Sequence, residues 1–544
     1  MAPEVEVEAA SAPAPPAPAP SAVAAPAPAP GPSAARSAAM VNAGMILARL
    51  VGLVRQNVQA HYFGTSAYAD VIAAAFRVGN ITQNLLGEGT LSASFIPVYA
   101  KLRAAGKPQE AKHFALAALG LLLVVVGVAS ALGAAGAPWL AWLIAAGFDA
   151  ERLDGTARLV RVVFPMTGLL VLSAWALGVL NAHRRFFLPY AAPVLWSVAQ
   201  IVGLWGAARF LGAHDEGLAL ALGWSAVAGA GLQLLVLLPA ARSLLGGLRP
   251  RLDLKDPSVR EAARRLPGVL IGRGVIQISG LVDMLLVSFL GTGANAAFNY
   301  AQSIYLFPMS LLGTGEAAVA LPEMAGDTAE LDLEKRNAKL RARLGASLGR
   351  LTVVSLPVTA VLAVLAREMI TALLRTGRFD HAAEARVEPL LMAYALALLG
   401  NASGRVLTTA FYALGDTRTP ARYAVYRVVA SSLLSLALMR ELGVLGVVLG
   451  AVTAAWIESG ALAWNLARRI GGLGLAEVKL GRAILLGAIT VAPSLAARAL
   501  VPAAIISTRL GALGILALAG VTLAIAAPAL GLFDVRSMMP RARR

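Results

Sequence analysis

The chain has 544 residues, of which 58% are hydrophobic and 14% charged, and its mean hydropathy is +0.71, values that predict a polytopic membrane protein and exclude a soluble enzyme. It contains no cysteine, which excludes disulfides and Cys-ligated zinc, and its five histidines lack the spacing of a metal site. The net charge of +17 lies mostly in short loops between apolar runs, a pattern typical of membrane orientation rather than of nucleic-acid binding.

Residues 1–37 consist almost entirely of Ala, Pro and Ser, which predicts a disordered, polyproline-like tail. Because this segment lacks a basic stretch followed by an apolar one, we do not expect a signal peptide.

From residue 38 onward the chain contains fourteen apolar stretches, each near the roughly 20 residues that an α-helix needs to cross a bilayer. We therefore predict an all-α membrane protein with fourteen transmembrane helices, the second and eighth of them bent. The expected spans are 38–60, 69–99, 113–134, 157–181, 189–209, 217–240, 266–289, 296–321, 348–374, 387–411, 421–440, 443–466, 482–501 and 510–532.

The distribution of Lys and Arg predicts the orientation. With the N-terminus in the cytoplasm, thirty basic residues fall in cytoplasmic loops and tails, ten fall in external loops, and seven arginines lie within spans. This excess follows the positive-inside rule, so we expect both termini to be cytoplasmic.

Three short motifs recur in the same order, at offsets of 227, 225 and 231 residues: FGT at 63–65 and LGT at 290–292, Pro97 and Pro322, and NA at 181–182 and YA at 412–413. Such a parallel repeat is typical of transporters, which place the substrate path between the halves. We predict an N-lobe at 38–240, a basic cytoplasmic linker at 241–265, a C-lobe at 266–467, a further helix pair at 482–535 and a basic tail at 536–544.

The stretch 48–97 concentrates the polar residues of the predicted spans, with Arg49, Arg55, Asp70, Arg77 and Glu88. A charge at bilayer depth costs at least about 2.5–3.5 kcal/mol, so such side chains usually face a polar cavity. Arg49 and Arg55 are about 9 Å apart along a helix and can face one broad cavity, or can snorkel to the interface. Arg77 has two open interpretations: an ion pair with Asp70 or Glu88, or a ligand contact.

Span seven carries Arg273, Gln277 and Asp283. Asp283 has no obvious local partner and is the strongest candidate to bind a coupling proton or monovalent cation, the alternative being an Arg or amide partner on another helix. Glu316 and Glu458 are weaker candidates of the same kind.

Arg405 and Arg427 lie on either side of the loop ALGDTRTPAR at 413–422. Within this loop Asp416 and its neighbours are suited to a turn and helix cap, so we interpret the loop as structural.

The ordered set of motifs resembles the MurJ (MviN) lipid II flippases of the MOP exporter superfamily over about residues 38–535. The resemblance rests on RLVGLVRQNVQAHYFGTSAYADVIAAAFRVGN and GEGTLSASFIPVYAKL near the start, VIQISGLVDMLLVSFLGTGANAAFNYAQSIYLFP in the middle and ALGDTRTPAR downstream. It implies two six-helix, MATE-like bundles around a cavity, with two C-terminal helices that form a groove for a lipid tail.

The resemblance also implies a function, namely flipping of the undecaprenyl-pyrophosphate-linked peptidoglycan precursor lipid II across the bacterial cytoplasmic membrane by alternating access. The protein would then be a transporter and not an enzyme. Its expected partners are the polyprenyl-diphosphate-linked precursor, membrane lipid and cell-wall synthesis proteins. We expect no cofactor beyond a coupling monovalent cation or proton, and no ATP-binding P-loop is present.

By this resemblance, Arg49 and Arg55 match the two helix-one arginines of the family, and Asp70 and Glu88 match acidic positions of its second helix. Arginine suits a diphosphate because its planar fork donates two parallel hydrogen bonds.

The sequence also departs from the family pattern. Gln83-Asn84 replaces an Arg pair in helix two, Gln302-Ser303 replaces Asp-Arg in helix eight, and Gly79 replaces a proline. We expect Arg49 and Arg55 to hold the diphosphate with Arg77 or Arg273 compensating, while Gln83, Gln302 and Ser303 bond other parts of the head group.

Four other functions stay open. A membrane glycosyltransferase would need catalytic carboxylates in sizeable external loops, which the sequence does not offer. A multidrug exporter would have a more apolar cavity without the helix-one arginines. A divergent relative that moves another lipid-linked oligosaccharide, or a non-transporting cell-wall scaffold, would account for the missing arginines.

Overall fold

The computed structural model describes residues 32–185, 187–327, 332–475 and 478–532; within these ranges it describes all side chains except those at 32–43, 88, 92, 271–273, 275–276, 311–323 and 325–327. Every secondary-structure element of the described residues is an α-helix, as the sequence predicts.

The N-terminal lobe comprises nine helices: α1 (Pro32–Phe63), α2 (Ala67–Leu86), α3 (Glu88–Ala104), α4 (Pro108–Ala135), α5 (Ala137–Ala145), α6 (Ala150–Ala182), α7 (Phe187–Ala191), α8 (Pro193–Phe210) and α9 (Asp215–Leu245). The long helix α6 is the centre of this lobe, because it packs against α2, α3, α4, α5 and α9. Its residues are apolar on nearly all sides, as expected of a helix that is surrounded by others.

The C-terminal lobe repeats this order with α10 (Pro257–Ser288), α11 (Ala294–Asp327), α12 (Leu333–Val364), α13 (Ala366–Leu374), α14 (His381–Ala413), α15 (Arg418–Leu442) and α16 (Val444–Ile470). The helix lengths repeat as well. Both α1 and α10 have 32 residues, α5 and α13 have 9, and α6 and α14 have 33. The central helix here is α14, which packs against α11, α12, α13 and α16.

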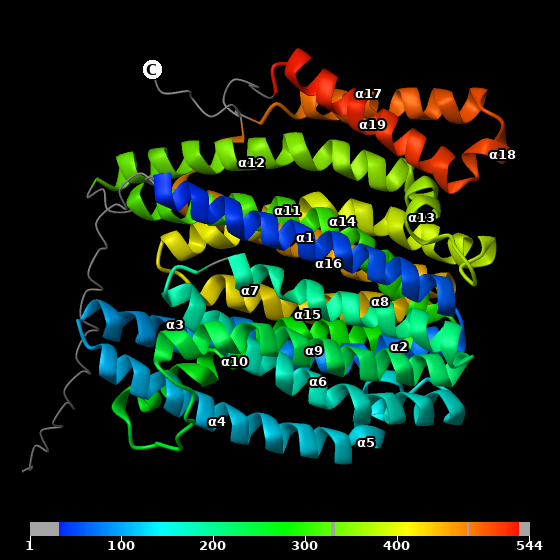
Figure 1. Ribbon diagram of the computed structural model, residues 1–544. Coiled ribbons are helices and arrows are strands. Elements are labelled where there is room, and N and C mark those ends of the chain that lie inside the picture. The colour runs from blue at the N-terminus through cyan, green and yellow to red at the C-terminus, as the bar shows by residue number, and fades with distance from the viewer. Residues whose placement is uncertain (1–31, 186, 328–331, 476–477, 533–544) are drawn as a thin grey trace, which may run out of the picture.

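The remaining helices are α17 (Leu480–Leu500), α18 (Ala503–Ile506) and α19 (Arg509–Ala529). Figure 1 shows α17 and α19, in orange and red, along the outer side of α12 and α13, at the opposite edge of the molecule from α4 and α5. The C-terminal pair therefore contacts only one lobe through its main interfaces.

Each predicted span coincides with one helix or with a broken pair. Among the described residues, nine helices are long and apolar enough to cross a membrane, so the full number of fourteen crossings stays a prediction. The expected bend in span two is a complete break, since α2 ends at Leu86 and Gly87 has φ −93° and ψ −136°. Span eight, in contrast, is the single helix α11. The sequence missed a break at Leu365, between α12 and α13.

The helix α10 joins the two lobes, because it packs against α2, α3 and α5 on one side and against α11, α15 and α16 on the other. The largest apolar core also continues from one lobe to the other and includes Phe63, Phe298, Tyr300 and Phe379. Side chains on α2, α10 and α11 therefore meet at the boundary between the lobes.

Candidate functional site

Arg55 lies on α1 and contacts α8 of the same lobe. Its Nη1 donates to Oε1 of Gln200 at 3.3 Å, and its guanidinium carbon lies 4.6 Å from the ring centroid of Trp196. Its Nε is buried without a hydrogen-bond partner, and none of the ion pairs among the described residues involves Arg55. The positive charge is thus held by an amide and an aromatic face and is not neutralised by an adjacent described carboxylate.

Arg49 lies six residues earlier on α1, about 9 Å along the helix axis. Its side chain is partly exposed between the exposed Leu47 and Leu50. The structure therefore places Arg49 and Arg55 on one helix but in different surroundings, and only Arg55 is fixed by a neighbouring helix.

Arg77 of α2 crosses to the other lobe. Its Nη1 donates to Oε1 of Gln302 on α11 at 3.3 Å, and Nε2 of Gln302 donates to the hydroxyl of Tyr394 on α14 at 3.5 Å. The guanidinium rests on the backbone of α10 at Gly280, where an added Cβ would lie 1.7 Å from Nη2. Only a glycine at position 280 leaves room for this arrangement.

Asp283 lies one turn further along α10, and its side chain is almost fully buried. It interacts electrostatically with Arg77 and with Arg427 of α15. The sequence left two alternatives for Asp283, a coupling ion or an arginine on another helix. The structure shows that Asp283 interacts with two arginines on other helices.

Asp70 occupies a different place from the one that the sequence predicted. Its side chain is fully buried and accepts hydrogen bonds from the backbone N–H groups of Gly293 at 2.6 Å and Ala296 at 2.8 Å. It also pairs with Nη1 of Arg152 at 3.3 Å. Of the interpretations left open for Arg77, the ion pair with Asp70 does not form, because Asp70 caps the start of α11 and joins the lobes.

Further contacts between the lobes gather around Asp70, in a region that we call the closed end. There the backbone N–H of Arg378 donates to the carbonyl of His61 at 2.8 Å, and the backbone N–H of Gly147 donates to Oγ of Ser288 at 3.0 Å. Gly64 has φ +55°, and a Cβ on it would lie 2.3 Å from the carbonyl oxygen of Arg378. The backbones approach so closely that only glycine fits.

The structure describes the side chains of only some of the other predicted site residues. Gln83 and Ser303 are partly buried, and the backbone carbonyl of Gln83 accepts from Gly87 at 2.7 Å, at the break between α2 and α3. The side chains of Glu88, Arg273 and Glu316 lie outside the described residues.

Two arginines of the C-terminal lobe, Arg405 on α14 and Arg427 on α15, lie on either side of the loop that joins these helices. Nη1 of Arg427 pairs with Oε2 of Glu458 on α16 at 2.9 Å, so Glu458 already has a cationic partner. Arg405 of α14 interacts electrostatically with Arg427 and with Tyr305. Their position in the middle of apolar helices was the signal that could have identified them.

The loop before α15 is structural, as predicted. The carboxylate of Asp416 accepts from the backbone N–H of Thr419 at 2.9 Å and from its hydroxyl at 2.7 Å, and it pairs with Arg469 at 2.5 Å. These contacts lower the pKa of Asp416 to about 2.

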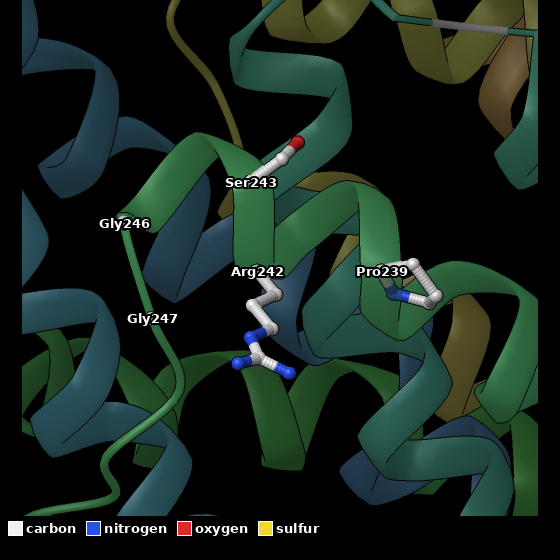
Figure 2. A pocket seen from close by; sticks show the side chains of 5 residues that line it. All are labelled: Pro239, Arg242, Ser243, Gly246 and Gly247. Atoms are coloured by element: carbon white, nitrogen blue, oxygen red, sulfur yellow. The ribbon is translucent and has the colours of Figure 1, made fainter.

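A surface cavity of about 450 Å³ lies at the end of α9, lined by Pro239, Arg242, Ser243, Gly246 and Gly247 (Figure 2). It belongs to the start of the predicted cytoplasmic linker and none of the predicted site residues lines it.

Two parallel helical lobes that repeat one another are the architecture of a membrane transporter built from an internal repeat. The fold is similar to that of a lipid II flippase MurJ in an inward closed conformation, with a TM-score of 0.74 at 18% identity over 92% of this chain and 100% of that chain. It is also similar to an inward-facing multidrug resistance MATE family transporter, with a TM-score of 0.65 at 16% identity over 81% and 99% of the two chains.

The sequence comparisons narrow this class. The family model of lipid II flippase MurJ matches residues 59–522. The lipid II flippase MurJ of Burkholderia cenocepacia is 29% identical over 80% of this chain and 84% of its own length. The probable lipid II flippase MurJ of Rhizobium tropici is 30% identical over 83% and 86% of the two chains. The chain belongs to the lipid II flippase MurJ family.

Proposed function

We propose that the protein translocates lipid II across the bacterial cytoplasmic membrane by alternating access of its two lobes. The observation that carries this proposal is Arg77, an arginine inside the membrane helices that contacts both lobes at once. A ligand that draws on this guanidinium changes contacts on α2, α10 and α11 together, and this is what coupling of binding to lobe movement requires.

The diphosphate of lipid II fits these arginines chemically. Neither Arg55 nor Arg77 lies within ion-pair distance of a described carboxylate, and each has a buried Nε without a hydrogen-bond partner. A diphosphate oxygen is a strong acceptor for such donors, and charged hydrogen bonds contribute about 1.5–3 kcal/mol each.

Arg77 also compensates for the arginine that the resembled family carries at position 303, in the eighth predicted span, which is α11 here. Gln302 stands where the resembled family carries an acidic residue, and it holds Arg77 at 3.3 Å. The charge that Ser303 lacks is therefore supplied at nearly the same place from α2. This compensation supports lipid II, rather than a less anionic ligand, as the cargo.

Coupling to a proton or monovalent cation follows from Asp283. Arg77 and Arg427 interact electrostatically with Asp283 and offset part of the cost of burying its charge. When the diphosphate draws Arg77 away, Asp283 loses part of that compensation and takes up a proton or a monovalent cation. We place both termini in the cytoplasm from the excess of basic residues on that side, which makes the closed end the external end.

The test combines complementation with direct binding. In cells depleted of their own lipid II flippase, the wild-type chain should restore growth, and native mass spectrometry of the purified protein should show bound lipid II. The Arg77→Ala variant should lose both, whereas Arg158→Ala, which removes an exposed ion pair with Asp154, should keep both. A wild-type chain that binds another lipid-linked glycan in preference to lipid II would refute the proposed cargo.

A further inference from the structure

A second cavity lies where the C-terminal helix pair meets the C-terminal lobe. It has a volume of about 340 Å³ and lies between α13, α14, α17 and α18. Three arginines and three glutamates line it, so their formal charges cancel: Arg367, Arg375, Arg498, Glu368, Glu384 and Glu388. We call this cavity the α13–α17 pocket.

Glu384 is one of the buried charged groups of the pocket, with a side chain that is only 5% exposed. Its Oε1 accepts from the hydroxyl of Thr371 at 2.8 Å, but its Oε2 is buried without any hydrogen-bond donor. The nearest side-chain nitrogen atoms are Nδ1 of His381 at 3.6 Å and Nη1 of Arg375 at 3.8 Å. A buried carboxylate oxygen without a donor is costly, so this atom marks a position for a ligand that donates hydrogen bonds.

Two of the three arginines lie at the rim. The side chain of Arg367 is 65% exposed and that of Arg498 is 38% exposed, and each pairs with a glutamate of the pocket wall. Since an arginine has five N–H donors, both keep donors for a second anion. The pocket thus has a carboxylate at its base and arginines at its rim. A ligand that matches it carries a cationic N–H donor at its tip and an anionic group behind it.

Next to the rim, the surface is strongly apolar. Leu500 is 84% exposed and Leu510 is 81% exposed, and Ile505 lies between them in the chain. In a membrane such side chains contact acyl chains. The ligand therefore continues from its anionic group into a hydrocarbon tail.

From this arrangement we propose that the α13–α17 pocket binds the head group of a phosphatidylethanolamine. The primary ammonium donates to Glu384, the phosphodiester accepts from Arg367 and Arg498, and the acyl chains lie against Leu500 and Leu510. By the orientation of the basic residues, the lipid comes from the outer leaflet. It seats α17 and α19 against α13, and it is distinct from the lipid II that the proposed function assigns to the lobe boundary.

The experiment measures lipid binding to the purified full chain by native mass spectrometry, with phosphatidylethanolamine, phosphatidylcholine and phosphatidylglycerol as probes. Phosphatidylethanolamine should bind about tenfold more tightly than the other two, because a quaternary ammonium has no N–H donor and a glycerol head group has no cation. Glu384→Gln should abolish this preference, since it removes the charge but keeps the acceptor for Thr371. Arg367→Ala should weaken phosphatidylethanolamine binding several-fold.

Arg158→Ala, a change at an exposed ion pair of the other lobe, is the matched control and should leave the preference unchanged. Equal binding of the three lipids by the wild type, or a preference that survives Glu384→Gln, would show that the pocket is only an ion-pair network. Equally tight binding of free phosphoethanolamine would overturn the assignment to a lipid. Complementation by the Glu384→Gln variant separates this outcome from a failure of the proposed function, because lipid II transport does not require the preference.

Discussion

Substitution of Gly280 by alanine tests how Arg77 is positioned. The new Cβ would lie 1.7 Å from Nη2 and 2.8 Å from Cζ of Arg77, so the guanidinium must retreat by about 2 Å to reach ordinary contact distance. That movement breaks the 3.3 Å hydrogen bond to Gln302. A hydrogen bond to a charged group contributes at least about 1.5 kcal/mol. Because about 1.4 kcal/mol corresponds to a factor of ten, lipid II transport should fall about tenfold.

The same substitution should not destabilise the fold. The obstructed atoms are the end of a flexible side chain, and alanine is favoured over glycine in a helix by about 0.8–1 kcal/mol. Gly274→Ala on the same helix is the matched control, because a Cβ there meets nothing within 4 Å. The assay is lipid II transport in depleted cells, with thermal unfolding in detergent as the measure of stability.

A double-mutant cycle tests whether Gly280 acts through Arg77. In an Arg77→Lys background, which keeps the charge but lacks the guanidinium, the remaining transport should be little affected by Gly280→Ala, because the effect of Gly280→Ala passes through that guanidinium. Full transport by the Gly280→Ala variant, or an equal loss in the presence and absence of Arg77, would contradict the assigned role of Gly280.

Four further predictions follow from the geometry. Arg55→Ala should abolish transport at unchanged expression while Arg55→Lys retains part of it, because lysine keeps the charge but not the planar fork; transport assays on matched membrane amounts decide this. Asp70→Asn should lower the unfolding temperature in detergent markedly, because breaking a buried ion pair costs about 3–5 kcal/mol, and an unchanged temperature would contradict the capping role. The lowered pKa of Asp416 stabilises the folded state above about pH 4, the unfolded-state value, and this contribution disappears as the pH falls towards 2; unfolding measured across that window should depend less on pH in Asp416→Asn. A single cysteine at the exposed His214 should be labelled from outside the cell, and labelling only from the cytoplasm would reverse the topology.

Much of the fold could be predicted from the sequence, because apolar length, glycine and proline are local signals. The break at Gly87 lies inside the span that was expected to bend. The break at Leu365 was not predictable in this way, since the sequence AVLAREM reads as continuous helix and carries no glycine or proline. Ala294, which lies between the predicted spans 266–289 and 296–321, is the buried first residue of α11.

The candidate site was harder to predict, because its contacts join residues far apart in the chain. Asp70 and Arg77 share a helix, which suggested a local pair, yet their partners are Arg152, 82 residues away, and Gln302, 225 residues away. The role of Gly280 depends on a missing side chain, and one sequence cannot distinguish such a glycine from the others in the same helix. Intramembrane charge indicated candidate residues but not what they contact.

The most direct test of the central claim measures lipid II at the outer face of the membrane. Cells depleted of their own flippase would receive this chain, and an externally added enzyme that cleaves lipid II would report how much of the lipid has crossed. We predict that the wild type restores cleavage and that the Arg55→Ala, Arg77→Ala double variant does not, at equal abundance in the membrane. Lipid II that stays protected in the presence of the wild type, or that becomes equally accessible with the double variant, would contradict the account.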